Sequence, residues 1–207
     1  NLAFVLPLND AWDNDGDVVF SFYSNDTNLQ SCTLWQNSSG IFSANVSNLS
    51  STGLQSGSVS SVRSLLPELT NIIWNIKCND SAGNTAFNTT LNYTISVDKT
   101  QPGVFDLTSP TNDTVSTIIN PSLTWSLPAE PNFLNYTVNI ANNTKFDNWT
   151  YQYERTGIIS NNSITIPDNL ESDKQYYWKV IVFDKAGNSR NSTNLFYYET
   201  DNTPPNI

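Results

Sequence analysis

Four aspartates crowd one short polar stretch near the start of the 207-residue chain, and carboxylates so spaced are candidate ligands for a hard cation. They are Asp10, Asp13, Asp15 and Asp17, within residues 9–17, which the sequence predicts to be a loop. The run from Asp13 to Asp17 partly resembles a calcium loop, but it lacks the distal glutamate and no helix pattern flanks it. Calcium at Asp13, Asp15 and Asp17 is one hypothesis, and solvated aspartates in a turn are the alternative.

The sequence offers few other groups for catalysis. It contains no histidine and two cysteines, so the usual nucleophile–base pairs are absent and a zinc ligand set is incomplete. Glycoside hydrolysis needs two carboxylates across a cleft, and the 19 acids fall almost all in predicted loops with no pair standing out. The sequence therefore predicts a protein that is not an enzyme and has no dedicated cofactor.

Asparagines in the pattern Asn-x-Ser/Thr, with x other than proline, are acceptors for N-linked glycans. The pattern occurs 13 times among 30 asparagines, where the composition alone would give roughly seven. This excess favours several covalent N-glycans, and an Asn- and Thr-rich composition without glycosylation is the alternative. The predicted acceptors are Asn25, Asn37, Asn45, Asn48, Asn79, Asn88, Asn92, Asn112, Asn135, Asn142, Asn148, Asn161 and Asn191.

The charge of the chain limits its partners. A net charge of −10 and a pI near 4.1 argue against binding nucleic acid, which needs a basic surface, and against docking on anionic lipid. No apolar run approaches the roughly 20 residues of a membrane span. We therefore expect neither a nucleic-acid partner nor direct membrane insertion of this segment.

One stretch of the sequence occurs twice, 104 residues apart. Residues 74–84 (Trp-Asn-Ile-Lys-Cys-Asn-Asp-Ser-Ala-Gly-Asn) return as residues 178–188 (Trp-Lys-Val-Ile-Val-Phe-Asp-Lys-Ala-Gly-Asn). Alternating apolar residues indicate one buried face of a β-strand, and Asp-x-Ala-Gly-Asn is typical of a tight turn. The repeat predicts two small all-β domains of about 100 residues each.

A second repeat marks the domain junctions. Residues 98–102 (Asp-Lys-Thr-Gln-Pro) are matched near the end of the chain by residues 201–205 (Asp-Asn-Thr-Pro-Pro). We therefore predict domains at 1–98 and 99–201, with 202–207 as the start of a next repeat or an inter-subunit extension. A segment of a longer array is slightly favoured over a subunit whose extension pairs with its neighbour by strand addition.

Seven short predicted strands per domain, separated by turns, indicate β-sandwiches. The second domain resembles a fibronectin type III domain, and the motifs that carry the resemblance are Pro121-x-Leu123-x-Trp125, Tyr136-x-Val138 and Leu170 with Tyr176 six residues later. The first domain, with Trp-x-Ile-x-Cys-x-Asp-x-Ala-Gly-Asn and an Asp-x-Thr-x-Pro linker, resembles Ig-like repeats of archaeal and bacterial surface proteins. The expected fold is all-β, with two tandem Ig-like/fibronectin type III-like β-sandwiches.

The resemblance has a consequence for the two cysteines. Cys32 and Cys78 align with Tyr136 and Val182 at the 104-residue offset. In such sandwiches these strands are neighbours in one sheet, which implies that the cysteines face each other. We predict a disulfide that stabilises the fold by about 2–4 kcal/mol, with two reduced core cysteines as the alternative. Antibody-type domains instead place the bridge across the two sheets.

The resemblance also implies a tyrosine corner at Tyr176, which should be absent from the first domain because Ile72 stands at the equivalent position. Surface repeats of this kind often hold calcium at the ends of their domains. The aspartates near such ends are Asp80, Asp98, Asp184 and Asp201. Solvated turn aspartates are again the alternative to a metal site.

The leading hypothesis is an extracellular structural protein: a glycosylated repeat or subunit of a surface filament, surface layer or adhesive stalk, joined to identical subunits or to further repeats. An alternative is a carbohydrate- or ligand-binding module of a secreted protein. Trp12, Trp35 and Trp149 are not assigned to buried faces, and exposed tryptophans can stack on sugar rings. Packing of these side chains at domain or subunit contacts, or under attached glycans, is the preferred alternative. An accessory part of a secreted hydrolase is a third hypothesis.

Overall fold

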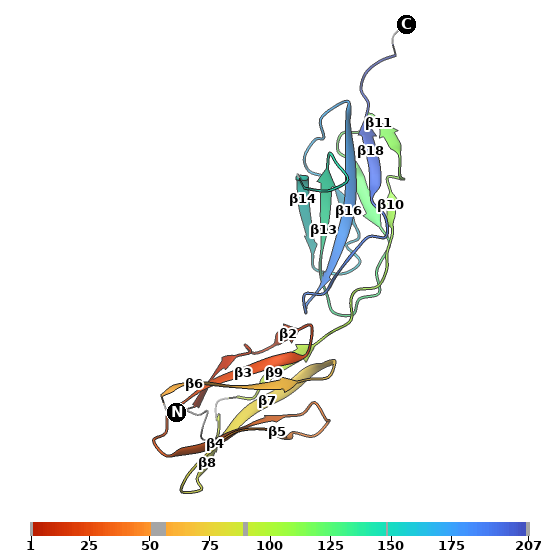
Figure 1. The fold of residues 1–207 in the computed structure, drawn as a ribbon. Coiled ribbons are helices and arrows are strands. Elements are labelled where there is room, and N and C mark those ends of the chain that lie inside the picture. The colour runs from red at the N-terminus through yellow and green to blue at the C-terminus, as the bar shows by residue number, and fades with distance from the viewer. Residues whose placement is uncertain (1, 51–56, 89–90, 148, 206–207) are drawn as a thin grey trace. The chain divides into compact units, whose positions relative to one another are not determined.

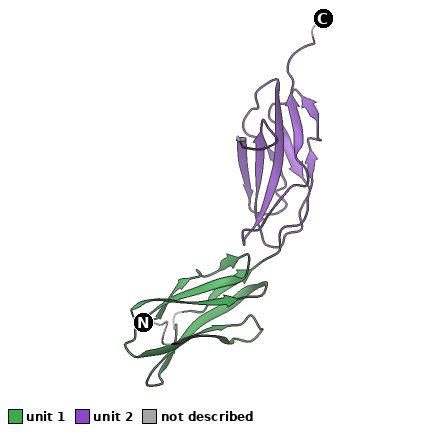
Figure 2. Cartoon of the chain, in the orientation of Figure 1, with its two compact units in different colours: residues 1–100 green, residues 101–207 purple. Residues whose placement is uncertain are grey.

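A computed structural model describes residues 2–50, 57–88, 91–147 and 149–205, without the side chains of residues 46–50 and 149. The chain forms two compact units, unit 1 (Asn1–Thr100) and unit 2 (Gln101–Ile207), coloured separately in Figure 2. Both units are built of β-strands, which confirms the predicted all-β class. No helix in the described ranges is long and apolar enough to cross a membrane.

Unit 1 is a sandwich of two sheets (Figure 1). The smaller sheet has the order β1-β3-β6, and the larger has the order β2-β9-β7-β4-β5 with β8 paired to β7. The strands are β1 (Leu2–Leu6), β2 (Ala11–Asp13), β3 (Asp17–Ser24), β4 (Leu29–Gln36), β5 (Ser43–Ser50), β6 (Ser58–Leu65), β7 (Leu69–Asp80), β8 (Thr85–Phe87) and β9 (Tyr93–Val97).

Unit 2 repeats this arrangement. Its smaller sheet is β10-β12-β15, and its larger sheet is β11-β18-β16-β13-β14 with β17 paired to β16. The strands are β10 (Leu107–Ser109), β11 (Thr114–Ser116), β12 (Ser122–Trp125), β13 (Phe133–Ala141), β14 (Trp149–Thr156), β15 (Ser163–Thr165), β16 (Lys174–Asp184), β17 (Ser189–Asn191) and β18 (Phe196–Thr200).

The core of unit 1 lies between its two sheets, where the period of two along each strand directs alternate side chains inward. Phe20 and Phe22 of β3 are fully buried, as is Trp74 of β7. The rings of Phe20 and Trp74 meet edge to face with centroids 4.8 Å apart. Apolar alternation in two strands of different sheets therefore produces one continuous core.

The core of unit 2 uses larger side chains. Trp125 of β12 packs across the sandwich on Tyr136 of β13, with ring centroids 5.1 Å apart. Trp178 and Val180 of β16 are buried beside them. Trp74 and Trp178 thus occupy the same place in the two units, as the 104-residue repeat predicts.

Each unit contains more strands than the seven that the sequence predicts: nine are formed within the described residues. Residues 9–17, predicted to be a loop, contain β2, which pairs in parallel with β9. Likewise, β11 pairs in parallel with β18 in unit 2. These strands have three residues each, too few to show an alternating pattern, and backbone pairing rather than side-chain type defines them.

Candidate functional sites

The aspartates of the first loop use their carboxylates to shape the turn between β2 and β3. The carboxylate of Asp13 accepts hydrogen bonds from the N–H groups of Asp15 and Gly16, and that of Asp15 accepts one from Asp17 at 2.7 Å. Asp17 forms an ion pair with Arg63 of β6, and the hydrogen bond from that guanidinium lowers the pKa of Asp17. These three aspartates do not form a group in the described chain with ligand oxygens all within 4.8 Å. Calcium at Asp13, Asp15 and Asp17 stays a prediction.

The repeated Asp-x-Ala-Gly-Asn motif forms the same turn in both units. In unit 1 the carboxylate of Asp80 accepts hydrogen bonds from the N–H and the side-chain amide of Asn84, both at 2.8 Å. Asp184 and Asn188 repeat both bonds at the same distances. The bond from the amide of Asn84 is the main reason that the pKa of Asp80 is lowered. The intervening Gly83 has φ of 86°, a region that residues with a Cβ rarely adopt.

The other two aspartates near the predicted domain ends also bind backbone amides. Thr100 donates its N–H to Asp98, and Thr203 donates its N–H to Asp201, each at 3.0 Å. In unit 2, a carboxylate oxygen of Glu130 lies within 4.8 Å of a carboxylate oxygen of Asp184. No sequence signal singled out Glu130, which follows a Leu-Pro-Ala loop. Calcium at the domain ends stays a prediction as well.

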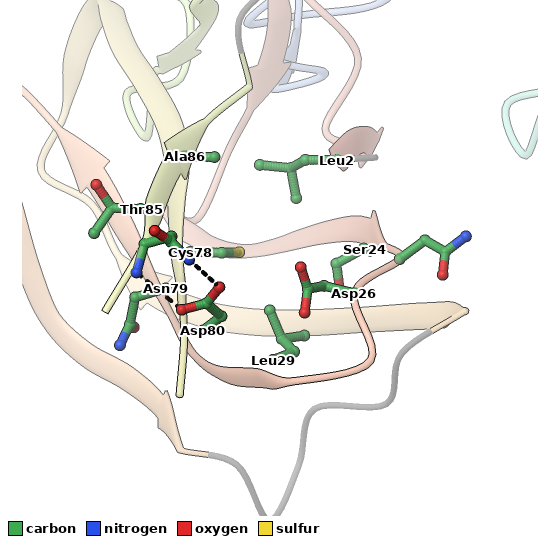
Figure 3. Close-up of a pocket in the computed structure, with 11 residues that line it drawn as sticks. Leu2, Ser24, Asp26, Leu29, Cys78, Asn79, Asp80, Thr85 and Ala86 are labelled. Carbon is green, nitrogen blue, oxygen red and sulfur yellow. Dashed lines mark hydrogen bonds between the residues drawn. The ribbon is translucent and has the colours of Figure 1, made fainter. Parts of the chain in front are cut away.

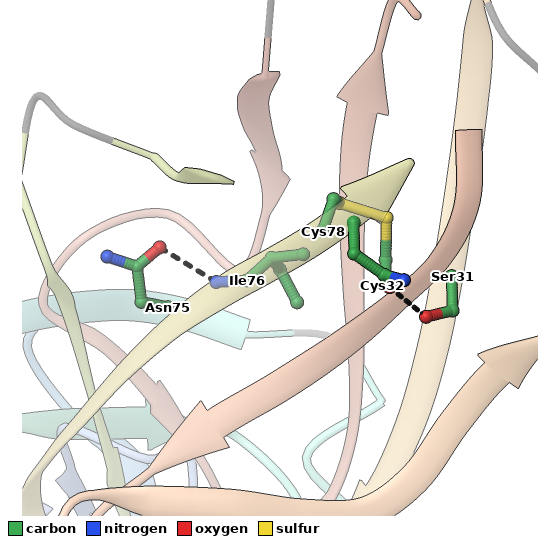
Figure 4. The surroundings of a disulfide bond; sticks show 6 residues. Ser31, Cys32, Asn75, Ile76 and Cys78 are labelled. Carbon is green, nitrogen blue, oxygen red and sulfur yellow. Dashed lines mark hydrogen bonds between the residues drawn. A yellow bond between two sulfur atoms is a disulfide. The ribbon is translucent and has the colours of Figure 1, made fainter. Parts of the chain in front are cut away.

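The two cysteines are joined by a disulfide, shown in Figure 4. Cys32 of β4 and Cys78 of β7 are directly opposite each other in neighbouring strands of the larger sheet. Tyr136 and Val182 are opposite each other in the equivalent strands of unit 2. The bridge therefore lies within one sheet rather than across the sandwich, at the place that the alignment indicates.

The tyrosine corner is present in unit 2. The hydroxyl oxygen of Tyr176 accepts a hydrogen bond of 3.0 Å from the backbone N–H of Glu171. Burial raises the pKa of Tyr176. In unit 1, Ile72 is fully buried at the equivalent position, and its side chain has no polar group to make such a bond.

Eleven of the 13 sequon asparagines have described side chains, and these are exposed or half-exposed. None of the eleven whose side chains are described is buried, and Asn25, Asn92, Asn112, Asn142 and Asn191 are among the exposed ones. Asn148 lies outside the described residues, and so does the side chain of Asn48. The buried asparagines in the described ranges are Asn75 and Asn139, and neither belongs to a sequon.

Of the three tryptophans not assigned to buried faces, Trp12 and Trp35 are half-buried, and the side chain of Trp149 lies outside the described residues. Trp35 belongs to a surface cluster with Phe42 and Phe87. Beside this cluster is a groove of about 320 Å³ on the outer face of the larger sheet of unit 1. The sequence showed neither Phe42 nor Phe87 as a partner of Trp35, because β5 and β8 had no clear pattern.

A second cavity of about 170 Å³ lies at the end of unit 1 where β1 begins (Figure 3). Leu2, Leu29 and Ala86 give it an apolar wall, and Ser24 and Asp26 line its polar side. Its mixture of small apolar and polar groups contains no nucleophile–base pair.

Residues 110–200, within unit 2, match the family described as the Rha78A-like, N-terminal immunoglobulin domain. This region is less than half of the chain. The sequence matches none of the curated proteins with which it was compared.

Solved structures with similar folds contain immunoglobulin and fibronectin domains. A marsupial T cell receptor has a TM-score of 0.63 at 10% identity, with 100% of this chain and 76% of that chain covered. The fibronectin(III)-like modules of Clostridium thermocellum CbhA give 0.56 at 11% identity, with 97% and 94% covered. The FN1–FN3 domains of chicken CNTN1 give 0.55 at 12% identity, with 94% and 68% covered.

At such low identities these similarities show the fold alone. The chain is two tandem β-sandwiches of the Ig-like and fibronectin type III-like class, as the sequence predicts. Sandwiches of this class host many unrelated functions, so the fold alone assigns none to this chain. A disulfide-bonded sandwich of this kind is often extracellular.

Proposed function

We propose that this chain is an extracellular structural protein, a glycosylated repeat or subunit of a surface filament, surface layer or adhesive stalk. Its partners are identical subunits or further repeats of the same chain. Two sandwiches with the same topology supply rigid modules, and the disulfide suits an oxidising compartment. The task of such a protein is mechanical, and it needs no reacting groups.

The number of sequons carries this proposal. The sequence contains 13, where composition alone would give roughly seven. Their places are compatible with it, because the buried asparagines of the described chain, Asn75 and Asn139, are outside sequons. Surface sequons on both units favour a protein coated with N-glycans, which shield sheet edges from unwanted pairing.

Two modes of assembly fit the chain. Residues 202–205 follow the last strand of unit 2 and belong to neither of its sheets. In an array they are the linker to a next sandwich, with Pro204 and Pro205 restricting its backbone. In a filament of separate subunits, the same end of the chain adds a strand to a neighbour.

Electron microscopy of native, undigested material tests the proposal. We expect fibres or a lattice with a repeat of one or two sandwich domains and side densities at the sequon positions. Continuous density between repeats would identify an array, and exchanged strands would identify separate subunits. Dispersed monomers without regular contacts would contradict the proposal.

A second candidate function is a carbohydrate-binding module of a secreted protein. The observation that favours it is the aromatic cluster around Trp35, which lies beside a groove on an exposed sheet face. Binding of polysaccharides to unglycosylated protein, lost in Trp35→Ala and kept in Trp12→Ala, would support it. Absence of binding to a broad set of glycans would leave the structural role as the better account.

A further inference from the structure

The outer face of the larger sheet in unit 1 carries three aromatic rings that are distant in the sequence. Trp35 lies at the end of β4, Phe42 just before β5 and Phe87 at the end of β8. The centroid of Trp35 is 5.3 Å from that of Phe87 and 5.9 Å from that of Phe42. Phe42 is 36% exposed, and the other two rings are half-buried. The rings form an apolar platform at the surface.

A cation completes this platform. The Nζ atom of Lys77 on β7 lies 5.5 Å from the ring centroids of both Trp35 and Phe87. Lys77 is directly opposite Phe87 in the pairing of β7 with β8. The site therefore offers an apolar surface for C–H groups and, at its edge, a donor for hydroxyl oxygens. A pyranose ring has both kinds of group, with axial C–H bonds on its faces and hydroxyls around its rim.

The groove beside the platform connects it to a glycosylation sequon. Thr33, Trp35, Lys77, Asn79 and Thr85 are among its lining residues. Asn79 of β7 pairs with Thr85 of β8. Lys77, which is two residues earlier on β7, pairs with Phe87. Two residues along a strand span about 7 Å. A sugar attached to Asn79 therefore starts within the groove, about one ring length from the aromatic platform.

The side chain of Asn79 is held in place by its neighbours. Its Oδ1 accepts a hydrogen bond from the hydroxyl of Ser31, and its Nδ2 donates one of 2.9 Å to Gln30. An N-linked glycan replaces only one of the two Nδ2 hydrogens, so both bonds can persist in the glycoprotein. This restricts the directions in which the first sugar can leave the strand.

We propose that the carbohydrate on Asn79 lies in this groove and stacks a pyranose ring on Trp35 and Phe87. The proposal rests on the glycosylation included in the proposed function. The glycan joins the β4–β5 hairpin to the β7–β8 hairpin, because the platform residues come from both.

The test uses full-length glycoprotein from a source that N-glycosylates, with occupancy of Asn79 measured by mass spectrometry of glycopeptides. Nuclear magnetic resonance then reports contacts between sugar protons and the indole of Trp35, together with upfield shifts of those sugar protons. Ser81→Ala is the matched variant: it removes the sequon and keeps Asn79 and its hydrogen bonds. We expect the contacts to be lost in Ser81→Ala and kept in Trp12→Ala.

Stability supplies a second readout through a double-mutant cycle of Ser81→Ala with Trp35→Ala. We expect loss of the glycan to raise the unfolding equilibrium constant of unit 1 on the order of fivefold when Trp35 is present, the size of an aromatic contact, and to leave it unchanged in Trp35→Ala. Asn191→Gln, which removes a sequon in unit 2, should show no coupling to Trp35. If Trp35→Ala does not fold, the nuclear magnetic resonance comparison of the wild type with Ser81→Ala tests the proposal by itself.

An unoccupied Asn79, or an occupied Asn79 without contacts to Trp35, overturns the proposal while other glycans leave the structural function standing. Absence of sugar from every sequon would contradict the glycosylated function itself. Binding of free polysaccharide at Trp35 in glycoprotein with Asn79 occupied would show that the groove is open. That outcome would overturn the proposal in favour of an external ligand.

Discussion

Two equivalent strand positions are linked by a covalent bond in unit 1 and are held together by side-chain packing in unit 2. Cys32 and Cys78 form the disulfide between β4 and β7. In unit 2, Tyr136 and Val182 are opposite each other in β13 and β16. The hydroxyl of Tyr136 donates a hydrogen bond of 2.9 Å to the carbonyl of Ile159.

The two cores also differ in the number of aromatic side chains that they contain. In the described chain, the core cluster of unit 1 contains three aromatic side chains, Phe20, Phe22 and Trp74. The cluster of unit 2 contains six, namely Phe105, Trp125, Tyr136, Tyr176, Trp178 and Tyr198. Aromatic side chains contribute the largest buried areas per residue. Unit 1 therefore obtains part of its stability from a cross-link, and unit 2 obtains the corresponding part from buried aromatic rings.

The largest expected effect comes from removing the cross-link. Reduction of the disulfide, or the double substitution Cys32→Val with Cys78→Val, should lower the free energy of unfolding of unit 1 by about 2–4 kcal/mol, because the unfolded chain gains freedom. The sequence separation of the two cysteines is 46 residues. Calorimetry with and without reductant measures the effect.

Unit 2 is the internal control for this experiment, since both cysteines of the chain lie in unit 1. Its transition should stay in place when the disulfide is reduced. If the reductant shifted the unfolding transitions of both units equally, or of neither, this would contradict the view that the disulfide stabilises unit 1 where buried rings stabilise unit 2.

Alkaline pH should destabilise unit 2, whereas reduction of the disulfide destabilises unit 1. Burial raises the pKa of Tyr136 to about 12. Because this folded-state pKa lies above the ordinary value of about 10, the stabilisation is complete below pH 10 and is lost as the pH rises towards 12. The expected loss is about 2 kcal/mol by pH 12. The disulfide at the equivalent place in unit 1 does not titrate.

Unfolding of each unit followed between pH 9 and pH 12 measures this difference. Tyr136→Phe is the matched variant, because it keeps the ring and removes the ionising hydroxyl. It should flatten the part of the pH dependence that comes from Tyr136. The same slope in the variant as in the wild type would assign the alkaline sensitivity to other groups.

The sequence determined the architecture well because its strongest signals are periodic. Trp74 and Trp178 begin alternating buried runs, and the turns that follow need their glycines, so the repeat predicted two small all-β domains. The repeat and the resemblance to known sandwiches together predicted the place of the disulfide. The short strand Ala11–Asp13 was not predicted, because parallel pairing with β9 is a property of the backbone. The platform of Trp35, Phe42 and Phe87 was also missed, since register between separate hairpins brings its members together.

The smallest effect concerns the tyrosine corner, which unit 2 has and unit 1 lacks. Tyr176→Phe removes the hydroxyl that accepts the hydrogen bond from the N–H of Glu171 and leaves the ring in the core. A net loss of about 1 kcal/mol in the unfolding free energy of unit 2 is expected, the usual contribution of one such bond. Tyr177→Phe, one residue along β16 on the opposite face, is the matched control and should cost less. Urea unfolding of both variants makes the comparison. If Tyr176→Phe proved no worse than Tyr177→Phe, the corner would not stabilise unit 2, and the aromatic core alone would have to balance the disulfide of unit 1.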